Sequence, residues 1–287
     1  MTHVSARRGA LYVSVAATAW GTGGSAGSLL FQTGGLGPAG VSLWRYLLGA
    51  AFLLVLTRGP VVVSGRLLLL GAGMAVYQTA YFAAIAHAGV AVATVVTMGA
   101  TPVFTALGSR FLLREPLGRV ALTALAAALA GLLLLTGETA LQSRPSSLAG
   151  IGYALASAAG YAGVTLYSRR HKGDDPQAVA IGGFVVAAAC LAPFALVEGV
   201  VPHVSATSVS LLLYLGAVPT ALAYGLFFSA LTVLRATTVS IISLGEAVGA
   251  AVLGVVLFGE RLTPLAWSGC ALLLAAVAVL AVRAESG

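Results

Sequence analysis

Charge is what this sequence lacks most. Only 8% of its 287 residues are Asp, Glu, Lys or Arg, against roughly 25% in a typical soluble domain. Eight acidic and fifteen basic side chains cannot coat a water-soluble globule of this length. A bilayer accepts an apolar exterior, provided that every backbone polar group is hydrogen-bonded within helices or a closed barrel. The shortage of charge therefore argues against a soluble enzyme and indicates a membrane protein.

Residues that hold metals, disulfides or phosphates are equally scarce. The two cysteines, Cys190 and Cys270, lie eighty residues apart in apolar runs, so they predict neither a disulfide framework nor a metal site. No histidine pair has metal-ligand spacing, and no glycine-rich loop leads to a lysine. We therefore expect no metal, no cofactor and no enzymatic activity. The basic residues that give the net charge of +7 form no continuous stripe, which argues against a nucleic-acid partner.

Long apolar runs are what the sequence does contain, because 59% of the residues are hydrophobic and the mean hydropathy is +1.01. The runs are continuous, whereas strands of a membrane barrel alternate apolar and polar residues. They predict an all-α membrane protein with ten transmembrane helices. The expected spans are 10–32, 39–56, 66–87, 90–112, 117–137, 146–168, 177–197, 207–230, 236–258 and 263–282.

The positions of the basic residues predict the orientation. With the N-terminus in the cytoplasm, twelve Lys and Arg residues fall on the cytoplasmic side, only Arg144 and Arg261 fall outside, and Arg45 lies within a span. Cytoplasmic loops carry the excess of positive charge in membrane proteins. We therefore expect a multi-pass protein of the bacterial inner (plasma) membrane with both termini in the cytoplasm. The lipid bilayer is the expected partner, and a monomer is the simplest expectation for the oligomeric state, which stays open.

The chain also repeats itself. The segment 112–117 resembles 257–262, and Glu115 and Glu260 are 260 − 115 = 145 residues apart. At the same offset, 70–72 matches 215–217. The first helices match at an offset of 141, with Gly9, Tyr12 and Trp20 against Gly150, Tyr153 and Tyr161. Two similar halves are predicted, residues 1–140 and 141–287. Because each holds five spans, the second half enters the membrane upside down, as in carriers with inverted repeats.

Several motifs are typical of one transporter family: Trp20-Gly21, Arg45, Thr101-Pro102-Val103-Phe104 leading to Glu115, and Gly245-Glu246-Ala247-Val248 leading to Gly259-Glu260-Arg261-Leu262. With these motifs the chain resembles the EamA family of the drug/metabolite transporter superfamily. The resemblance covers nearly the whole length and implies ten helices in two inverted five-helix repeats that transport small metabolites or amino acids, frequently outward. One departure is Ala247, where the family often has a proline that would kink the ninth helix.

Two charged residues fall inside expected spans and are the first candidates for the substrate site. Glu246 lies near the middle of the ninth span, where an ionised acid costs about 2.5–3.5 kcal/mol on insertion scales. We expect it to carry a proton or bind a substrate amine, although a carboxyl that only joins helices would look the same. Arg45 lies near the middle of the second span. It could bind a substrate carboxylate, pair with Glu246, or reach along its helix to water.

Aromatic and amide side chains are the other candidates. Tyr77 and Tyr81 are four residues apart and so on one helix face, with Gln78 between them. Trp20 and Tyr161 occupy matching places in the two halves, near the middle of the membrane. Such groups suit a cavity for a partly apolar metabolite, and ordinary helix packing is the alternative for each of them. The sequence gives no such reason for Trp44, Tyr46 and Trp267, which we interpret as packing residues.

Pro102 and Pro219 interrupt the fourth and eighth spans and are candidate hinges. Together these features predict a secondary active transporter, exporting amino acids or similar small amphipathic metabolites by alternating access, with coupling to protons through Glu246. An organic cation, such as a quaternary ammonium compound caged by the rings, is the alternative substrate. An intramembrane enzyme or a helical scaffold without substrate is the second alternative.

Overall fold

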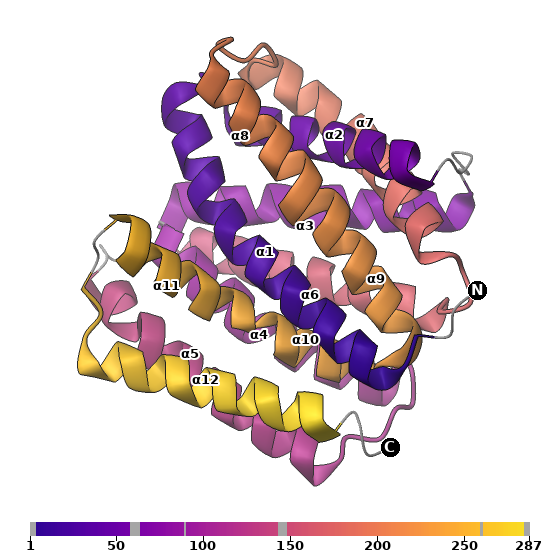
Figure 1. The fold of residues 1–287 in the computed structure, drawn as a ribbon, viewed down its shortest axis with the longest axis vertical. Coiled ribbons are helices and arrows are strands. Elements are labelled where there is room, and N and C mark those ends of the chain that lie inside the picture. The colour runs from indigo at the N-terminus through magenta and orange to yellow at the C-terminus, as the bar shows by residue number, and fades with distance from the viewer. Residues whose placement is uncertain (1–3, 58–63, 89, 143–147, 259–260, 284–287) are drawn as a thin grey trace.

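The computed structural model describes residues 4–57, 64–88, 90–142, 148–258 and 261–283, and within these ranges the chain is helical with no strand (Figure 1). The helices are α1 (Ala6–Thr33), α2 (Pro38–Thr57), α3 (Gly65–Ala88), α4 (Val90–Phe111), α5 (Arg119–Gln142), α6 (Leu148–Arg170), α7 (Pro176–Glu198), α8 (Ala206–Gly216), the π-helical segment η1 (Ala217–Leu222), α9 (Ala223–Val233), α10 (Ala236–Ser243), α11 (Gly245–Phe258) and α12 (Pro264–Arg283). Glu260, predicted to match Glu115, lies outside the described residues.

Eight of the described helical stretches are long and apolar enough to cross a membrane. Here α8, η1 and α9 form one stretch, Ala206–Val233, and α10 with α11 forms another, Ala236–Val256. The helices α1 and α6 are long but are not among the eight, which corresponds to their glycine- and alanine-rich sequences. The all-α membrane architecture expected from the apolar runs is thus confirmed.

Local sequence signals explain where several helices begin. The Ser5 hydroxyl accepts a hydrogen bond from the Arg8 backbone N–H at 3.3 Å, which caps α1. Asp175 caps α7 in the same way through the Ala178 N–H at 3.0 Å, and Pro176 follows at the first helical position. Ser205 caps α8 through the Ser208 N–H at 3.1 Å. These caps satisfy backbone donors that a helix leaves without partners.

Two helical stretches are irregular inside the bundle, and only one of the irregularities contains a proline. Pro219 has no N–H, so the Leu215 carbonyl four residues earlier loses its helical donor. The chain widens into η1 there, and the Thr220 hydroxyl donates to the Leu215 carbonyl at 2.7 Å. The second irregularity is one tightened turn at Leu244, between α10 and α11, where the backbone stays helical at φ −62° and ψ −16°. By contrast, α4 continues through Pro102 without a change of helix type.

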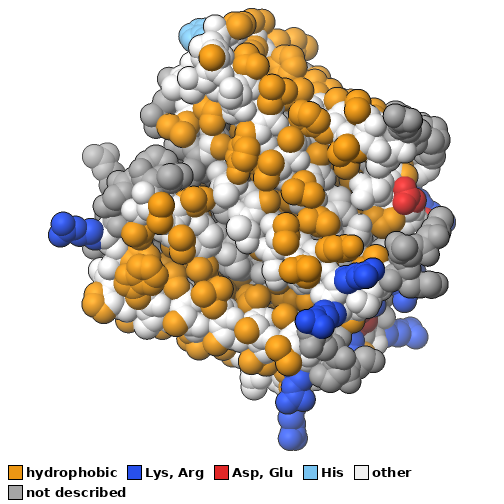
Figure 2. Space-filling view, viewed as in Figure 1, with side chains coloured by type: hydrophobic (Ala, Val, Ile, Leu, Met, Phe, Trp, Pro, Cys, Tyr) orange, Lys and Arg blue, Asp and Glu red, His pale blue; other side chains and the backbone are white. Residues whose placement is uncertain are grey.

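In Figure 1, α1 crosses the front of the bundle, while α2 with α7 and α5 with α12 lie at opposite sides. α1 packs against α8, η1, α9, α10 and α11, and α6 packs against α3, α4, α9 and α10. Large apolar side chains stay exposed on the outside, among them Val55 at 75%, Leu56 at 76% and Phe111 at 73%. Figure 2 shows such side chains spread over the visible face. A soluble monomer seldom exposes so much contiguous apolar surface, so this exterior fits lipid.

Candidate substrate site

Glu246 lies in the first turn of α11, directly after the tightened turn at Leu244. Its side chain is half-buried and makes no hydrogen bond or ion pair with any residue that the structure describes. The tightened turn occurs although Ala247 replaces the proline that the family often has. The helix therefore tightens by one turn next to an acid without a partner among the described residues, while its backbone stays in the helical region.

Gly21 of α1 holds this part of α11 close. A methyl group at Gly21 would lie 2.8 Å from the Glu246 carbonyl oxygen and 2.9 Å from the Ala250 backbone nitrogen. Both atoms belong to the backbone and cannot turn aside as a flexible side chain would. In the Trp20-Gly21 pair, Trp20 therefore supplies an aromatic ring, and Gly21 lets α1 approach the backbone at Glu246.

A change at Gly21 tests this contact. We expect Gly21→Ala to push α11 away from α1 and to destabilise the protein by about 1–3 kcal/mol, as for overpacked cores. The thermal midpoint of the purified protein in detergent measures the effect. Gly27→Ala is the matched control on the same helix, because a methyl group there has no atom within 4 Å. Equal midpoints for the two variants would contradict the close contact.

Aromatic rings from both halves of the chain meet beside α1. The Trp20 ring lies 5.1 Å from the Tyr224 ring and 5.4 Å from the Phe227 ring, both edge-on. The Tyr161 ring lies 5.4 Å from Tyr77 and 5.9 Å from Phe227. We call these five residues the aromatic cluster. Trp20 Nε1 is buried and has no hydrogen-bond partner among the described residues, so a donor inside the cluster stays available.

A chain of tyrosine hydroxyls extends from the cluster toward Arg45. The Tyr77 hydroxyl is hydrogen-bonded to that of Tyr224, and it lies 3.4 Å from the Tyr46 hydroxyl. The Arg45 guanidinium carbon lies 6.0 Å from the centre of the Tyr46 ring, and its Nε donates to the Thr220 hydroxyl at 3.2 Å. Thr220 follows Pro219 in η1, so the π-helical segment supplies the acceptor for the Arg45 hydrogen bond.

Arg45 and Glu246 do not pair with each other in the part of the chain that the structure describes. Arg45 is half-buried and bonds only a neutral hydroxyl. A cation and an anion therefore lie in the interior of one bundle without neutralising one another. Unpaired charges inside a membrane protein are costly and mark functional positions.

The remaining predicted residues lie at the edge of this arrangement. The Tyr81 hydroxyl is 2.8 Å from that of Thr94 on α4, and its ring packs in a separate small apolar cluster with Ala84 and Ala93. Gln78 is buried on the same helix. Pro219 borders α1, since a methyl group at Gly23 would lie 3.1 Å from its Cβ.

Sequence reasoning missed Tyr224, Phe227 and Thr220, and it interpreted Tyr46 as a packing residue. Tyr46 is fully buried at 0% exposure and shares the hydroxyl chain with Tyr77. One available signal was the spacing of Tyr224 and Phe227, three residues apart and directly after the proline-containing segment. Such a pair lies on one helix face.

Comparisons with known proteins identify the family of the chain. Residues 7–137 and 148–282 each match the EamA-like transporter family. The uncharacterized transporter YwfM of Bacillus subtilis (strain 168) is 30% identical over 281 residues, which cover 94% of this chain and 92% of that protein. A solved crystal structure shares the fold with a TM-score of 0.83 at 24% identity, covering 97% of this chain and 98% of its own. The chain belongs to the EamA-like transporter family, within the drug/metabolite transporter superfamily.

Proposed function

We propose that this protein is a secondary active transporter, exporting amino acids or similar small amphipathic metabolites by alternating access. The observation that carries the substrate class is that Glu246 and Arg45 are both half-buried and that neither has an ion-pair partner among the described residues. A zwitterion would place its ammonium group at the acid and its carboxylate at the arginine. The rings of Trp20, Tyr77 and Tyr161 would then cover its apolar part, with Tyr81 and Gln78 at the margin.

The architecture behind the proposal is two inverted five-helix repeats, 1–140 and 141–287, with α1 and α6 as the first helix of each. Matching glycines support it. Gly9 of α1 packs against Val233 and Leu234 at the end of α9, and Gly150 of α6 packs against the end of α3. Ten spans follow when α1 and α6 are added to the eight apolar stretches.

A second pair of glycines supports the same relation. Gly71 of α3 packs against Val186 of α7, and Gly216, which lies 216 − 71 = 145 residues later, packs against Leu48 of α2. Each half thus places a glycine at one sequence position of the repeat and packs it against the second helix of the other half. Two interlocked halves of this kind can exchange conformations around a central site.

The orientation in the proposal has both termini in the cytoplasm of a bacterium, with the protein in the inner membrane. In Figure 1 the beginning of α1 and the end of α12 lie toward the same side of the bundle. The blue Lys and Arg side chains in Figure 2 gather mainly toward that side. The positive-inside rule makes it the cytoplasmic side.

Glu246 is the proposed proton carrier. A carboxyl group is the one acidic type of side chain that can both bind an ammonium group and exchange a proton with water near neutral pH when its environment allows. Pro219 would serve as a hinge, because η1 already departs from regular helix, and Pro102 would do so only if α4 bends in another conformation. No cofactor enters this scheme, and the working unit is taken as a monomer.

An organic cation is the second candidate substrate, and the gathering of the Trp20, Tyr224 and Phe227 rings favours it. Aromatic faces attract quaternary ammonium groups. Such a substrate needs Glu246 and the rings but not Arg45. Replacing Arg45 with Gln therefore separates the two classes, since it should impair transport of a zwitterion and spare a simple cation. The enzyme and scaffold alternatives have no specific observation in their favour.

Counterflow in proteoliposomes tests the proposal. Purified protein is reconstituted, the vesicles are loaded with a panel of unlabelled amino acids or quaternary ammonium compounds, and uptake of the labelled counterpart is followed with and without a pH gradient. We expect accumulation of at least one amino acid that exceeds protein-free vesicles severalfold and responds to the gradient. Accumulation of quaternary ammonium compounds alone would change the proposed substrate from an amino acid to an organic cation. A protein that exchanges no member of the panel would contradict it.

A further inference from the structure

Buried polar side chains gather in one part of the bundle. They lie on α4, α6 and α10, between the middle of the bundle and the end where α4 and α6 finish and α10 begins. These three helices pack against one another. We call the group the inner polar core, and its members are Thr101, Thr105 and Ser109 on α4, Thr165 and Ser168 on α6, and Thr237, Ser240 and Ser243 on α10.

The inner polar core holds more than half of the buried polar residues that the structure describes. Twelve polar residues are buried in the described part of the chain, and seven of them belong to the inner polar core. Four of the eight hydroxyls donate to a carbonyl of their own helix, as when Thr105 donates to the Thr101 carbonyl at 2.8 Å. The hydroxyls of Ser168, Thr237 and Ser240 are buried without a partner among the described residues. A buried hydroxyl that makes no hydrogen bond is costly in lipid or protein.

One end of the inner polar core adjoins the candidate substrate site. Ser243 ends α10, and Glu246 follows three residues later in the first turn of α11. Thr165 donates to the carbonyl of Tyr161, a member of the aromatic cluster, at 2.9 Å. The polar residues therefore continue from the site along the interior of the bundle.

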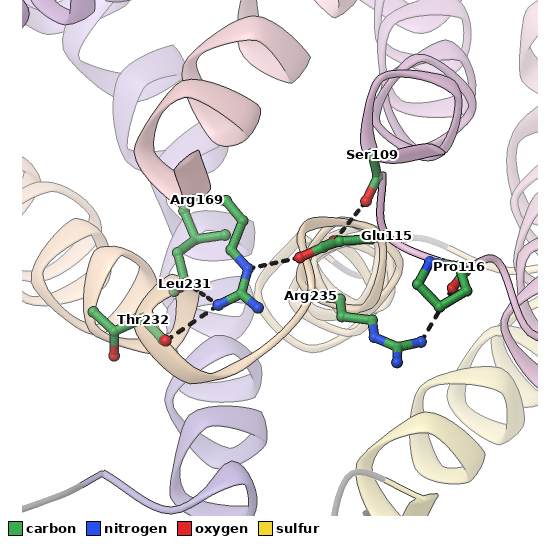
Figure 3. A network of polar contacts seen from close by, with 7 residues as sticks. All are labelled: Ser109, Glu115, Pro116, Arg169, Leu231, Thr232 and Arg235. Carbon is green, nitrogen blue, oxygen red and sulfur yellow. Dashed lines mark hydrogen bonds and ion pairs between the residues drawn. The ribbon is translucent and has the colours of Figure 1, made fainter. Parts of the chain in front are cut away.

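At the other end of the inner polar core lies an ion pair with several hydrogen bonds (Figure 3). Arg169 Nε lies 2.9 Å from Glu115 Oε1, and the Ser109 hydroxyl donates to Glu115 Oε2 at 2.6 Å. Arg169 Nη1 also donates to the carbonyls of Leu231 and Thr232 in the last turn of α9, at 2.9 and 3.1 Å. The residues Leu112, Leu113, Glu115, Arg169, Arg170 and Lys172 line a surface pocket at this point.

We propose that the inner polar core is the closed half of the substrate path and that the Glu115–Arg169 ion pair is its latch. The proposal rests on the transport function proposed above. A path for a small zwitterion must offer hydrogen bonds along its length, which explains why unpaired hydroxyls persist where apolar residues would pack at lower cost. When the helices separate, water and the polar ends of the substrate become the missing partners.

The latch joins the two proposed repeats at a point that has to move. Glu115 belongs to the first half, whereas Arg169 and the end of α9 belong to the second. The side chains of the pair are only 12% and 15% exposed, so the interaction is poorly screened by water. A second ion pair, Arg66–Asp174, also joins the halves but is 60% and 39% exposed with a distance of 3.6 Å. Exposed pairs contribute little, so Asp174 supplies a matched control.

Cysteine labelling tests the proposal without a substrate. In a background with Cys190→Ala and Cys270→Ala, Ser240→Cys reports the inner polar core and Leu107→Cys reports the lipid-facing side of α4, where Leu107 is 49% exposed. A membrane-impermeant maleimide is added to inside-out or right-side-out vesicles. With the latch intact, we expect slow labelling at position 240. Arg169→Gln should accelerate it about tenfold in inside-out vesicles only, a coupling of ordinary size, whereas Asp174→Asn should not.

A second latch variant and the lipid-facing reporter complete the labelling experiment. Glu115→Gln removes the same ion pair more gently and is read in place of Arg169→Gln if that variant does not fold, as judged by size-exclusion chromatography. The Leu107→Cys reporter should stay unreactive in every variant. Unchanged labelling at position 240 in both latch variants, or equal acceleration by Asp174→Asn, would overturn the latch. Neither result would bear on the proposed transport function. A latch that opens in a protein that transports nothing would instead count against the proposed function.

Discussion

Glu246→Gln is expected to abolish coupled transport. The substitution keeps the size and shape of the side chain but removes both the negative charge and the exchangeable proton. No described residue pairs with Glu246, so the loss falls on the substrate or the proton and not on a structural ion pair. A hydrogen bond to a charged group is worth about 1.5–3 kcal/mol. Transport should therefore fall by about tenfold to a hundredfold or more.

The measurement is counterflow and gradient-driven uptake in proteoliposomes over a range of pH. Glu246→Asp, which keeps the carboxyl group, should retain part of the activity. Glu198→Gln removes a carboxylate of the same kind that only accepts a hydrogen bond from the Ala39 N–H at 2.8 Å, and transport should survive it. Normal transport by Glu246→Gln at all pH values would show that protons are not coupled through this residue.

The positions of the helices were readable from the sequence because apolar runs and capping residues are local signals. The runs at 177–197 and 263–282, for example, correspond closely to α7 and α12. The tightened turn at Leu244 could not be predicted in this way, since no proline marks it. The contact beside it is equally invisible to local signals, because Gly21 of α1 approaches the backbone of α11 directly after Leu244.

The candidate site was only partly predictable for a similar reason. Contacts between Tyr77 and Tyr224 join residues 147 positions apart, and no spacing rule connects them. Tyr77 and Tyr81 lie on one face of α3, yet four residues turn the helix by slightly more than a full revolution. The two side chains therefore point in slightly different directions. Tyr77 packs against Tyr161 of α6, whereas Tyr81 is hydrogen-bonded to Thr94 of α4. The sequence left open whether Arg45 and Glu246 pair, and among the described residues they form no ion pair.

Gly131→Leu is expected to prevent stable folding, because two helix backbones touch at that position. A methyl group at Gly131 of α5 would lie 2.8 Å from the Gly269 carbonyl oxygen of α12, and one at Gly269 would lie 2.6 Å from the Gly131 oxygen. Small residues allow such close approach between membrane helices. A leucine has to force the helices apart, at a cost of about 3 kcal/mol or more. The yield of monodisperse protein and the thermal midpoint in detergent measure this loss.

Gly137→Leu supplies the control for that experiment, because Gly137 lies on the same helix with no atom within 4 Å of an added methyl group. It adds the same apolar surface and removes the same glycine flexibility, so any difference between the variants belongs to the α5–α12 contact. Equal yield and equal midpoints would contradict the contact. Because α5 and α12 lie together at one side of the bundle, the Gly131→Leu protein that does fold should transport at the normal rate per molecule. A loss of specific activity would instead mean that this helix pair moves during transport.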